Sequence, residues 1–151
     1  MTPSTTIQVI AYRDAIAEIQ AIRRQVFQQE QGVSAELEFD GLDDGAAHLL
    51  AYDQTQAIGT ARTRKLSDGK AKIERVAVLA AYRGRGIGRQ IMVAAIEHLR
   101  SQGVTAVKIN AQLQVQNFYA RLGFEAEGGV FEEAGISHIT MWLRHLAEIS
   151  G

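Results

Sequence analysis

Apolar residues recur along the chain with two different periods, which together predict a series of helices and strands. A helical period, with apolar side chains three and four positions apart, predicts helices over residues 15–31, 86–102 and 115–122. Shorter apolar or alternating runs, bounded by turn-like sequences, predict strands over residues 7–10, 47–52, 57–64, 70–78, 104–110 and 136–143. Residues 32–45 are acidic and irregular, so we expect a long loop there with room for one helical turn.

The order of these elements predicts an α/β fold with a mixed sheet. The three strands between residues 47 and 78 follow one another through short connections, which favours an antiparallel meander. Helices and strands then alternate to the end of the chain. No repeat, low-complexity tract or proline-rich linker interrupts this series. We therefore expect one domain over residues 1–151.

Composition excludes several classes of protein. Of the 151 residues, 46% are hydrophobic and 22% are charged, which is typical of a globular domain. The 16 Lys and Arg residues nearly balance the 17 Asp and Glu residues, so no overall field attracts nucleic acid. The absence of cysteine excludes disulfides, thiolate zinc sites, iron–sulfur clusters and an acyl-cysteine intermediate.

The sequence also leads to expectations about the location of the protein and about metal binding. No stretch approaches the roughly 18 apolar residues of a membrane span, and the first six residues lack the basic flank of an export signal. We therefore expect a cytoplasmic protein without a membrane partner. The four histidines do not have the spacing of metal ligands, so we expect no metal site; they are His48, His98, His138 and His145.

The most informative segment is a glycine-rich turn between a predicted strand and a predicted helix. Gly84, Gly86 and Gly88 alternate with other residues, and Arg83, Arg85 and Arg89 surround them. Backbone N–H groups without neighbouring Cβ atoms, at the start of a helix, favour a phosphate ligand. A plain tight turn with solvated arginines is the simpler alternative. The spacing differs from a dinucleotide-binding fingerprint, and the Gly-Lys-Ser/Thr of a P-loop is absent.

Two motifs in this order give the chain a resemblance to a known family. The segment Arg83-x-x-Gly86-x-Gly88, after Val76-Ala77-Val78, resembles the pyrophosphate-binding motif of the GNAT superfamily of N-acetyltransferases. The segment from Asn117 to Phe124 resembles the family's second motif, a helix that carries a tyrosine and ends in Leu-Gly-Phe. Residues 24–31, 111–112 and 132–141 resemble the ElaA-like subgroup in particular.

The resemblance implies a GNAT-like fold that binds acetyl-CoA. Its mixed, mostly antiparallel central sheet would be flanked by helices and splayed in the middle to hold the cosubstrate. The cofactor-binding residues that it implies are Val76, Ala77, Val78, Arg83, Gly84, Arg85, Gly86, Ile87, Gly88, Arg89, Asn110, Gln112, Asn117 and Tyr119. Many family members have an asparagine at the position of Gln112, which contacts the pantetheine arm. Asn117 is a candidate to replace that contact.

The resemblance also implies direct attack of an amine on the thioester, which agrees with the missing cysteine. A backbone N–H on the strand at Val76–Val78 would stabilise the oxyanion. Tyr119 is the candidate general acid, because a phenol with a pKa of ~10 can protonate a thiolate whose conjugate acid has a pKa of ~8.5. An ordinary core tyrosine is the alternative.

Glu74 and His138 are both candidates for the general base. Strand alternation places Glu74 on the face of Val76 and Val78. A charge at the exposed end of a strand is an equally good interpretation. His138 lies on the late strand and has a side chain suited to proton transfer, but it could equally be a structural histidine bonded to Glu132 or Glu133.

The sequence says less about the amine that accepts the acetyl group than about the cofactor. Two acidic segments, residues 36–44 and 125–133, would favour a cationic amine if both line the cleft. Arg23 or Arg24 could help to shape the acceptor pocket, but arginines in solvent are the simpler expectation. The resemblance implies a small-molecule or peptide amine as partner and is compatible with a homodimer. Two alternatives are a CoA-binding sensor without activity and a nucleic-acid patch at residues 83–86.

Overall fold

The computed structural model describes residues 5–148, in which eight strands form one sheet in the order β1-β2-β3-β4-β5-β8-β6, with β7 paired to β8. All neighbouring pairs are antiparallel except β4 and β5. The strands are β1 (Thr5–Ala11), β2 (Ala47–Asp53), β3 (Gln56–Lys65), β4 (Lys70–Val78), β5 (Ala106–Gln112), β6 (Glu125–Ala126), β7 (Phe131–Glu133) and β8 (Ile136–Arg144). This confirms the mixed, mostly antiparallel sheet.

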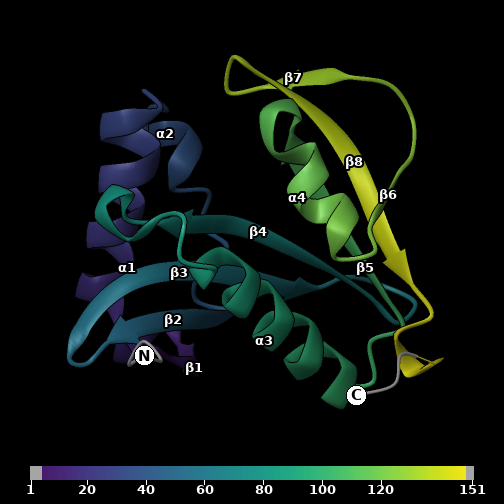
Figure 1. Ribbon diagram of the computed structural model, residues 1–151, viewed down its shortest axis with the longest axis horizontal. Coiled ribbons are helices and arrows are strands. Elements are labelled where there is room, and N and C mark those ends of the chain that lie inside the picture. Colours follow the sequence, from purple (N-terminus) through teal and green to yellow (C-terminus); the bar gives the residue numbers. More distant parts are fainter. Residues whose placement is uncertain (1–4, 149–151) are drawn as a thin grey trace.

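Helices connect the strands and cover the sheet (Figure 1). They are α1 (Ile16–Arg23), α2 (Ala35–Glu38), α3 (Ile87–Ser101), α4 (Gln116–Arg121) and a π-helix, η2 (Arg24–Glu30), that continues α1. Short 3₁₀ turns occur at η1 (Tyr12–Asp14), η3 (Ala80–Tyr82), η4 (Leu113–Val115) and η5 (Leu146–Glu148).

The sheet has an apolar core on each face. Leu49 and Leu50 are neighbours in β2 and both are fully buried, but Leu49 packs in the cluster that contains Ile91 of α3. Leu50 packs in a second cluster with Ile19 and Ile22 of α1. Because successive side chains of a strand point to opposite faces, α1 and α3 cover opposite sides of the sheet.

The sheet opens into a V between β4 and β5. These parallel strands pair only at Lys70–Lys72 and Ala106–Lys108, although β4 continues to Val78 and β5 to Gln112. Beyond that point, β4 follows the half of the molecule with α1, and β5 follows α4 and β8 (Figure 1). The splayed sheet expected from the resemblance is therefore present.

Most of the predicted elements are confirmed, including the helical turn in the acidic loop, and differences occur at the first helix and in two short strands. The helix predicted over residues 15–31 changes at Arg24 from an α-helix to a π-helix. The acidic loop does contain a helical turn, α2, where the Leu37 N–H donates to the Ser34 hydroxyl. The short strands β6 and β7 were not predicted. Residues 1–4, which bear on the export prediction, lie outside the described residues.

Candidate functional site

A cavity of about 1140 Å³ occupies the V between β4 and β5. Its walls come from the end of η2, the second half of β4, the glycine-rich turn, β5, α4 and β8. Most of the residues predicted for the site line it: Glu74, Val76, Ala77, Val78, Arg83, Gly84, Gly86, Ile87, Gly88, Arg89, Asn110, Gln112, Tyr119 and His138. Arg85 and Asn117 are not part of its wall.

The β4 wall presents an unpaired strand edge to the cavity. After Lys72, β4 no longer pairs with β5, so its backbone groups on that edge have no strand partner from Ile73 to Val78 in the described part of the chain. Backbone N–H and C=O groups require hydrogen-bond partners. This edge can therefore bind an extended ligand that has amide and carbonyl groups.

A β-bulge in β4 changes which residues face the α3 side. Thr60 pairs with Ala77 and Arg62 with Glu74, so two β4 residues, Arg75 and Val76, face one residue of β3. Arg75 has a φ of 57°, in the left-handed region. Such a bulge shifts the alternation of side chains by one position.

The expectation that Glu74 shares a face with Val76 and Val78 is therefore wrong. Val76 and Val78 pack against the α3-side cluster, whereas Glu74 binds Arg62 on the opposite side. Nothing in the alternation of the sequence marks the bulge, because an arginine rather than a glycine takes the left-handed conformation. Glu74 nevertheless lines the cavity, near its α2 end.

The glycine-rich turn begins α3 and faces the cavity. Gly84 and Gly86 have φ values of 79° and 78°, which glycine adopts without strain. Gly86 precedes the first residue of the helix, and the first backbone N–H bonded back to the turn is that of Gln90, at 3.1 Å from the Gly86 oxygen. The N–H groups of the first helical turn are thus available to an anion, with the positive end of the helix dipole behind them.

The arginines of this turn have different surroundings. Arg83 donates to the Val78 carbonyl at 2.9 Å and forms an ion pair of 2.8 Å with Glu30 of η2. Arg85 stacks over the ring of Tyr82, with 5.2 Å to the ring centroid, and lies outside the cavity wall. Arg89 lies on the cavity wall. Only Arg83 and Arg89 of the three predicted arginines are thus at the cavity.

The β5 wall carries two amide side chains. Asn110 accepts a hydrogen bond of 3.0 Å from Thr140 of β8. Gln112 donates to Gln31 at 3.2 Å, which connects β5 with the end of η2 across the V. Asn117 is exposed and not part of the wall, so it is not placed to substitute for Gln112.

Tyr119 lies on α4 and lines the cavity from the β5 side. Its ring packs edge-on against Phe118 at 4.9 Å and Phe124 at 6.1 Å between centroids. Burial raises the pKa of Tyr119 to about 12, because an apolar surrounding disfavours the phenolate. The hydroxyl is therefore protonated at neutral pH and can act as a proton donor.

His138 is buried on β8, and its ring stacks on Phe131 of β7 with centroids 5.9 Å apart. Nδ1 lies 2.7 Å from the carbonyl oxygen of Ile136. Because a carbonyl only accepts, Nδ1 carries the proton of this hydrogen bond, and Nε2 of the neutral ring keeps its lone pair. Nε2 is 4.0 Å from a carboxylate oxygen of Glu133, beyond hydrogen-bond distance.

Glu74 is surrounded by cations. Arg62 and Arg64 bind its carboxylate, the latter at 2.8 Å, and Lys72 lies 3.8 Å away. Burial raises the pKa of Glu74, but the hydrogen bonds and charges of these cations outweigh burial and hold the pKa below its usual value. Such a carboxylate is a weak base.

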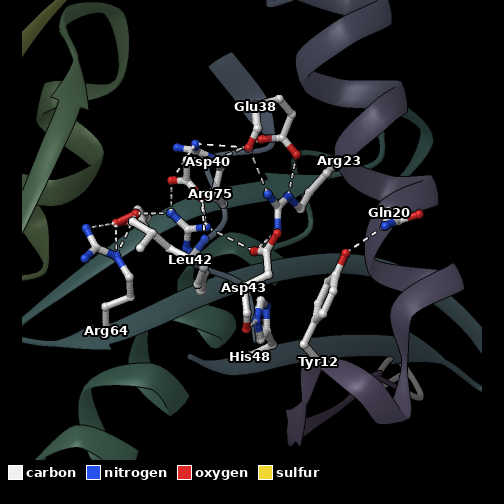
Figure 2. Close-up of polar contacts among 12 residues, drawn as sticks. Tyr12, Gln20, Arg23, Glu38, Asp40, Leu42, Asp43, His48, Arg64 and Arg75 are labelled. Atoms are coloured by element: carbon white, nitrogen blue, oxygen red, sulfur yellow. Dashed lines mark hydrogen bonds and ion pairs between the residues drawn. The ribbon is translucent and has the colours of Figure 1, made fainter. Parts of the chain in front are cut away.

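The acidic loop binds arginines rather than lining the cavity with free negative charge (Figure 2). Arg23, which is 2% exposed, bonds Glu38 and Asp43 at 2.6 Å each, so the expectation that Arg23 is solvated is wrong. The fully buried Arg62 bonds Asp40 and Asp43. Of the predicted acidic residues, only Glu38, Asp40 and Glu133 line the cavity.

Sequence reasoning missed the arginines that organise this side of the cavity. Arg62 and Arg75 lie within predicted strands, and each binds a carboxylate more than 20 positions away along the chain. A buried charge requires such partners. The only signal in the sequence was the presence of arginine inside a predicted strand, which does not identify the partner.

Within residues 5–148, no group of three or more His, Asp or Glu side chains is arranged to hold a metal ion. No helix in this part of the chain is both long and apolar enough to cross a bilayer.

Comparison with known proteins agrees with the fold and the motifs. Residues 11–145 match the acetyltransferase (GNAT) domain. ElaA of Escherichia coli is 33% identical over 80% of this chain and 81% of its own length. The crystal structure of ElaA aligns with a TM-score of 0.81 at 29% identity, over 91% of this chain and 98% of that one.

Two other solved structures extend the comparison. An acyl-CoA N-acyltransferase from Pseudomonas aeruginosa is 31% identical, with a TM-score of 0.82 over 92% of this chain and 99% of that one. PaiA N-acetyltransferase from Thermoplasma acidophilum, solved in complex with coenzyme A, shares the fold at 16% identity, with a TM-score of 0.69 over 94% and 99% of the two chains. On the evidence of its fold, its motifs and these matches, the chain belongs to the GNAT acetyltransferase family, and ElaA is among its relatives.

Proposed function

We propose that the protein is an N-acetyltransferase that transfers the acetyl group of acetyl-CoA directly to a primary amine. The observation that carries this proposal is the open edge of β4 in the V. Pantetheine is an extended chain with amide groups, and an unpaired strand edge supplies donors and acceptors for it. The N–H groups near Val76 on this edge are candidates to stabilise the oxyanion that develops on the thioester carbonyl.

The glycine-rich turn supports binding of the pyrophosphate. Gly86 and Gly88 leave the first turn of α3 accessible, and Arg89 adds a positive charge beside it. Arg83 is partly neutralised by Glu30, so it would contribute most if a phosphate displaced that carboxylate. One continuous cavity extends from this turn to Tyr119 on the opposite wall.

Tyr119 is the proposed general acid. The amine nitrogen forms a bond to the carbonyl carbon, the carbon–sulfur bond breaks, and the departing thiolate takes the proton of the Tyr119 hydroxyl. A phenol with a pKa of about 12 is a weak acid for a thiol in water. However, the apolar surroundings that raise this pKa also raise that of a thiol leaving into the same cavity.

His138 is the proposed general base, in preference to Glu74. Its Nε2 has a free lone pair in the tautomer that the Ile136 carbonyl selects, and the side chain lines the cavity. Glu74 has a lowered pKa and is already bound by Arg62 and Arg64. His138 would take the proton that the amine loses as it attacks.

An assay of thiol release from acetyl-CoA tests this function. The panel contains polyamines, aminoglycosides, amino acids and short peptides, and the cysteine-free chain contributes no thiol to the background. We expect release with one class of amine, accompanied by the acetylated amine in equal amount. Binding of acetyl-CoA without release for any amine would favour a CoA-binding sensor, and failure to bind it would refute the proposal.

A further inference from the structure

The charged side chains at the α2 end of the cavity form one interlocked cluster, and Figure 2 shows part of it, with Arg23, Glu38, Asp40, Asp43, Arg64 and Arg75 labelled. Its four carboxylates belong to Glu38, Asp40, Asp43 and Glu74, and its five cations to Arg23, Arg62, Arg64, Lys72 and Arg75. Each carboxylate contacts at least two cations. The cluster therefore carries a surplus of one positive charge, and the three carboxylates that the acidic loop contributes to it, Glu38, Asp40 and Asp43, are each bound by two arginines.

Within this cluster, three cations and three carboxylates line the cavity. The side chains of Arg64, Lys72 and Arg75 are 20–24% exposed. Among the lining carboxylates, Glu38 and Glu74 are 1% and 8% exposed, and Asp40, at 28%, is bound by Arg62 and Arg75. A molecule that enters from this side thus meets carboxylates that already have arginine partners, and Lys72, whose one carboxylate contact within residues 5–148 is 3.8 Å long.

Two lysines lie side by side at the point where the V begins. Lys72 pairs with Lys108 in the last rung of the β4–β5 ladder, so the two side chains lie on the same face. Like charges at neighbouring positions of a sheet repel each other. Among the ion pairs found in residues 5–148, none involves Lys108, and Lys72 has only the 3.8 Å contact with Glu74.

We propose that the amine acceptor carries an anionic group, which binds at Lys72 with Arg64 and Lys108 beside it. This inference rests on the proposed transferase function and adds the chemical class of the acceptor to it. An anion at this point would relieve the repulsion between Lys72 and Lys108. On the other arm of the V, Glu133 and His138 face the cavity and suit the amine end of the same molecule.

Matched pairs of amines test this class. One series contains ω-amino acids from glycine to 6-aminohexanoate, each compared with the alkylamine of equal chain length. A second arm compares O-phosphoethanolamine with ethanolamine, which distinguishes a phosphate from a carboxylate. We expect the anionic member of the best pair to have a kcat/KM at least ~10-fold higher, since a charge-assisted contact of ~1.4 kcal/mol produces this factor.

A pair of variants locates the effect. Lys72→Gln should reduce the preference for the anionic amine to within ~3-fold, because Arg64 is engaged by Glu74 and Lys108 is not part of the cavity wall. Lys65→Gln is the matched control: it removes the same charge from an exposed residue of β3 that contacts Gln102 beside α3, outside the cavity wall. The control should keep the full preference of the unmodified protein.

The possible failures are distinguishable. Turnover of alkylamines equal to or faster than that of their anionic partners would overturn this inference and leave the transferase intact. A preference that survives Lys72→Gln would also overturn it, because the anion would then bind elsewhere. Absence of thiol release for every amine would refute the proposed function and this inference together.

Discussion

Arg75 has an unusual backbone conformation, and its side chain forms ion pairs with the loop that contains α2. A non-glycine residue with a φ of 57° is strained, and such a conformation persists only where its surroundings impose it. The Arg75 side chain forms ion pairs with Glu38 at 2.8 Å and Asp40 at 3.3 Å, which attach the α2 loop to the bulge in β4. The residue that reorients Val76 toward the cavity is thus held by the loop whose Glu38 and Asp40 line the same cavity.

His138 provides a test at the residue level. In His138→Asn, the amide nitrogen can still donate to the Ile136 carbonyl, but the basic Nε2 is lost. We expect kcat to fall ~100-fold with little change in the affinity for acetyl-CoA, because a general base contributes about this factor. Steady-state kinetics would measure it, with His98→Asn on α3 as the control. Activity within twofold of the unmodified protein would exclude His138 as the base.

At the level of elements, neither packing nor backbone conformation requires a glycine at Gly88, in the first turn of α3. A Cβ added at Gly88 would lie 3.6 Å from Cζ of Phe118, an ordinary van der Waals contact, and Gly88 has no positive φ. The fold therefore does not require glycine at this position. A ligand that binds the N–H groups of the first helical turn would require glycine there, because a side chain would stand in its way.

Gly88→Ala should consequently separate stability from binding. Alanine has a higher helix propensity, so the free energy of unfolding should be unchanged or rise by up to ~1 kcal/mol. The affinity for CoA should fall ~10-fold or more, because the methyl group occupies space beside the exposed N–H groups. Thermal denaturation and calorimetric titration would measure the two effects. Gly129→Ala, outside the cavity, is the control, and unchanged CoA affinity in Gly88→Ala would argue against a phosphate site here.

The first helix shows why one element was only partly predictable. Apolar positions recur from Ile16 to Phe27 without interruption, so the pattern indicates one amphipathic helix. The structure widens it into a π-helix from Arg24, in which the Gln31 N–H bonds to the Val26 carbonyl. This change brings Phe27 and Gln31 to the cavity wall. Local periodicity contains no signal for it.

At the scale of the whole molecule, the sequence predicted local features better than long-range ones. Strands, helices and the glycine-rich turn depend on neighbouring residues, and β4 was predicted with its observed bounds. The bulge at Arg75 and the partners of Arg62 depend on contacts between distant segments. Acidic residues in a loop look solvated in a sequence, and only the fold reveals that arginines of α1 and β3 neutralise them.

The buried charge cluster also determines how stability varies with pH. Hydrogen bonding to Arg62 lowers the pKa of Asp40, and the arginine partners of Asp43 and Glu74 outweigh burial and lower theirs. A carboxyl whose pKa is lower in the folded state stabilises the fold above its unfolded pKa of ~4 and loses this contribution as the pH falls. Burial also lowers the pKa of His48 and His98, so the fold begins to lose stability as the pH falls below about 7. Denaturant titrations should therefore show a free energy of unfolding that decreases gradually from pH 7 to about 5.5 and then steeply toward pH 3. A free energy independent of pH in that lower range would contradict the role given to the cluster.

The most direct test of the transfer mechanism is the turnover of Tyr119→Phe with the best acceptor. Phenylalanine retains the edge-on contacts with Phe118 and Phe124 and removes only the hydroxyl. We predict a fall in kcat of ~100-fold or more with unchanged affinity for acetyl-CoA, while Tyr52→Phe, whose hydroxyl bonds Glu18 away from the cavity, keeps full activity. Full activity of Tyr119→Phe would contradict the assignment of Tyr119 as the acid that releases coenzyme A.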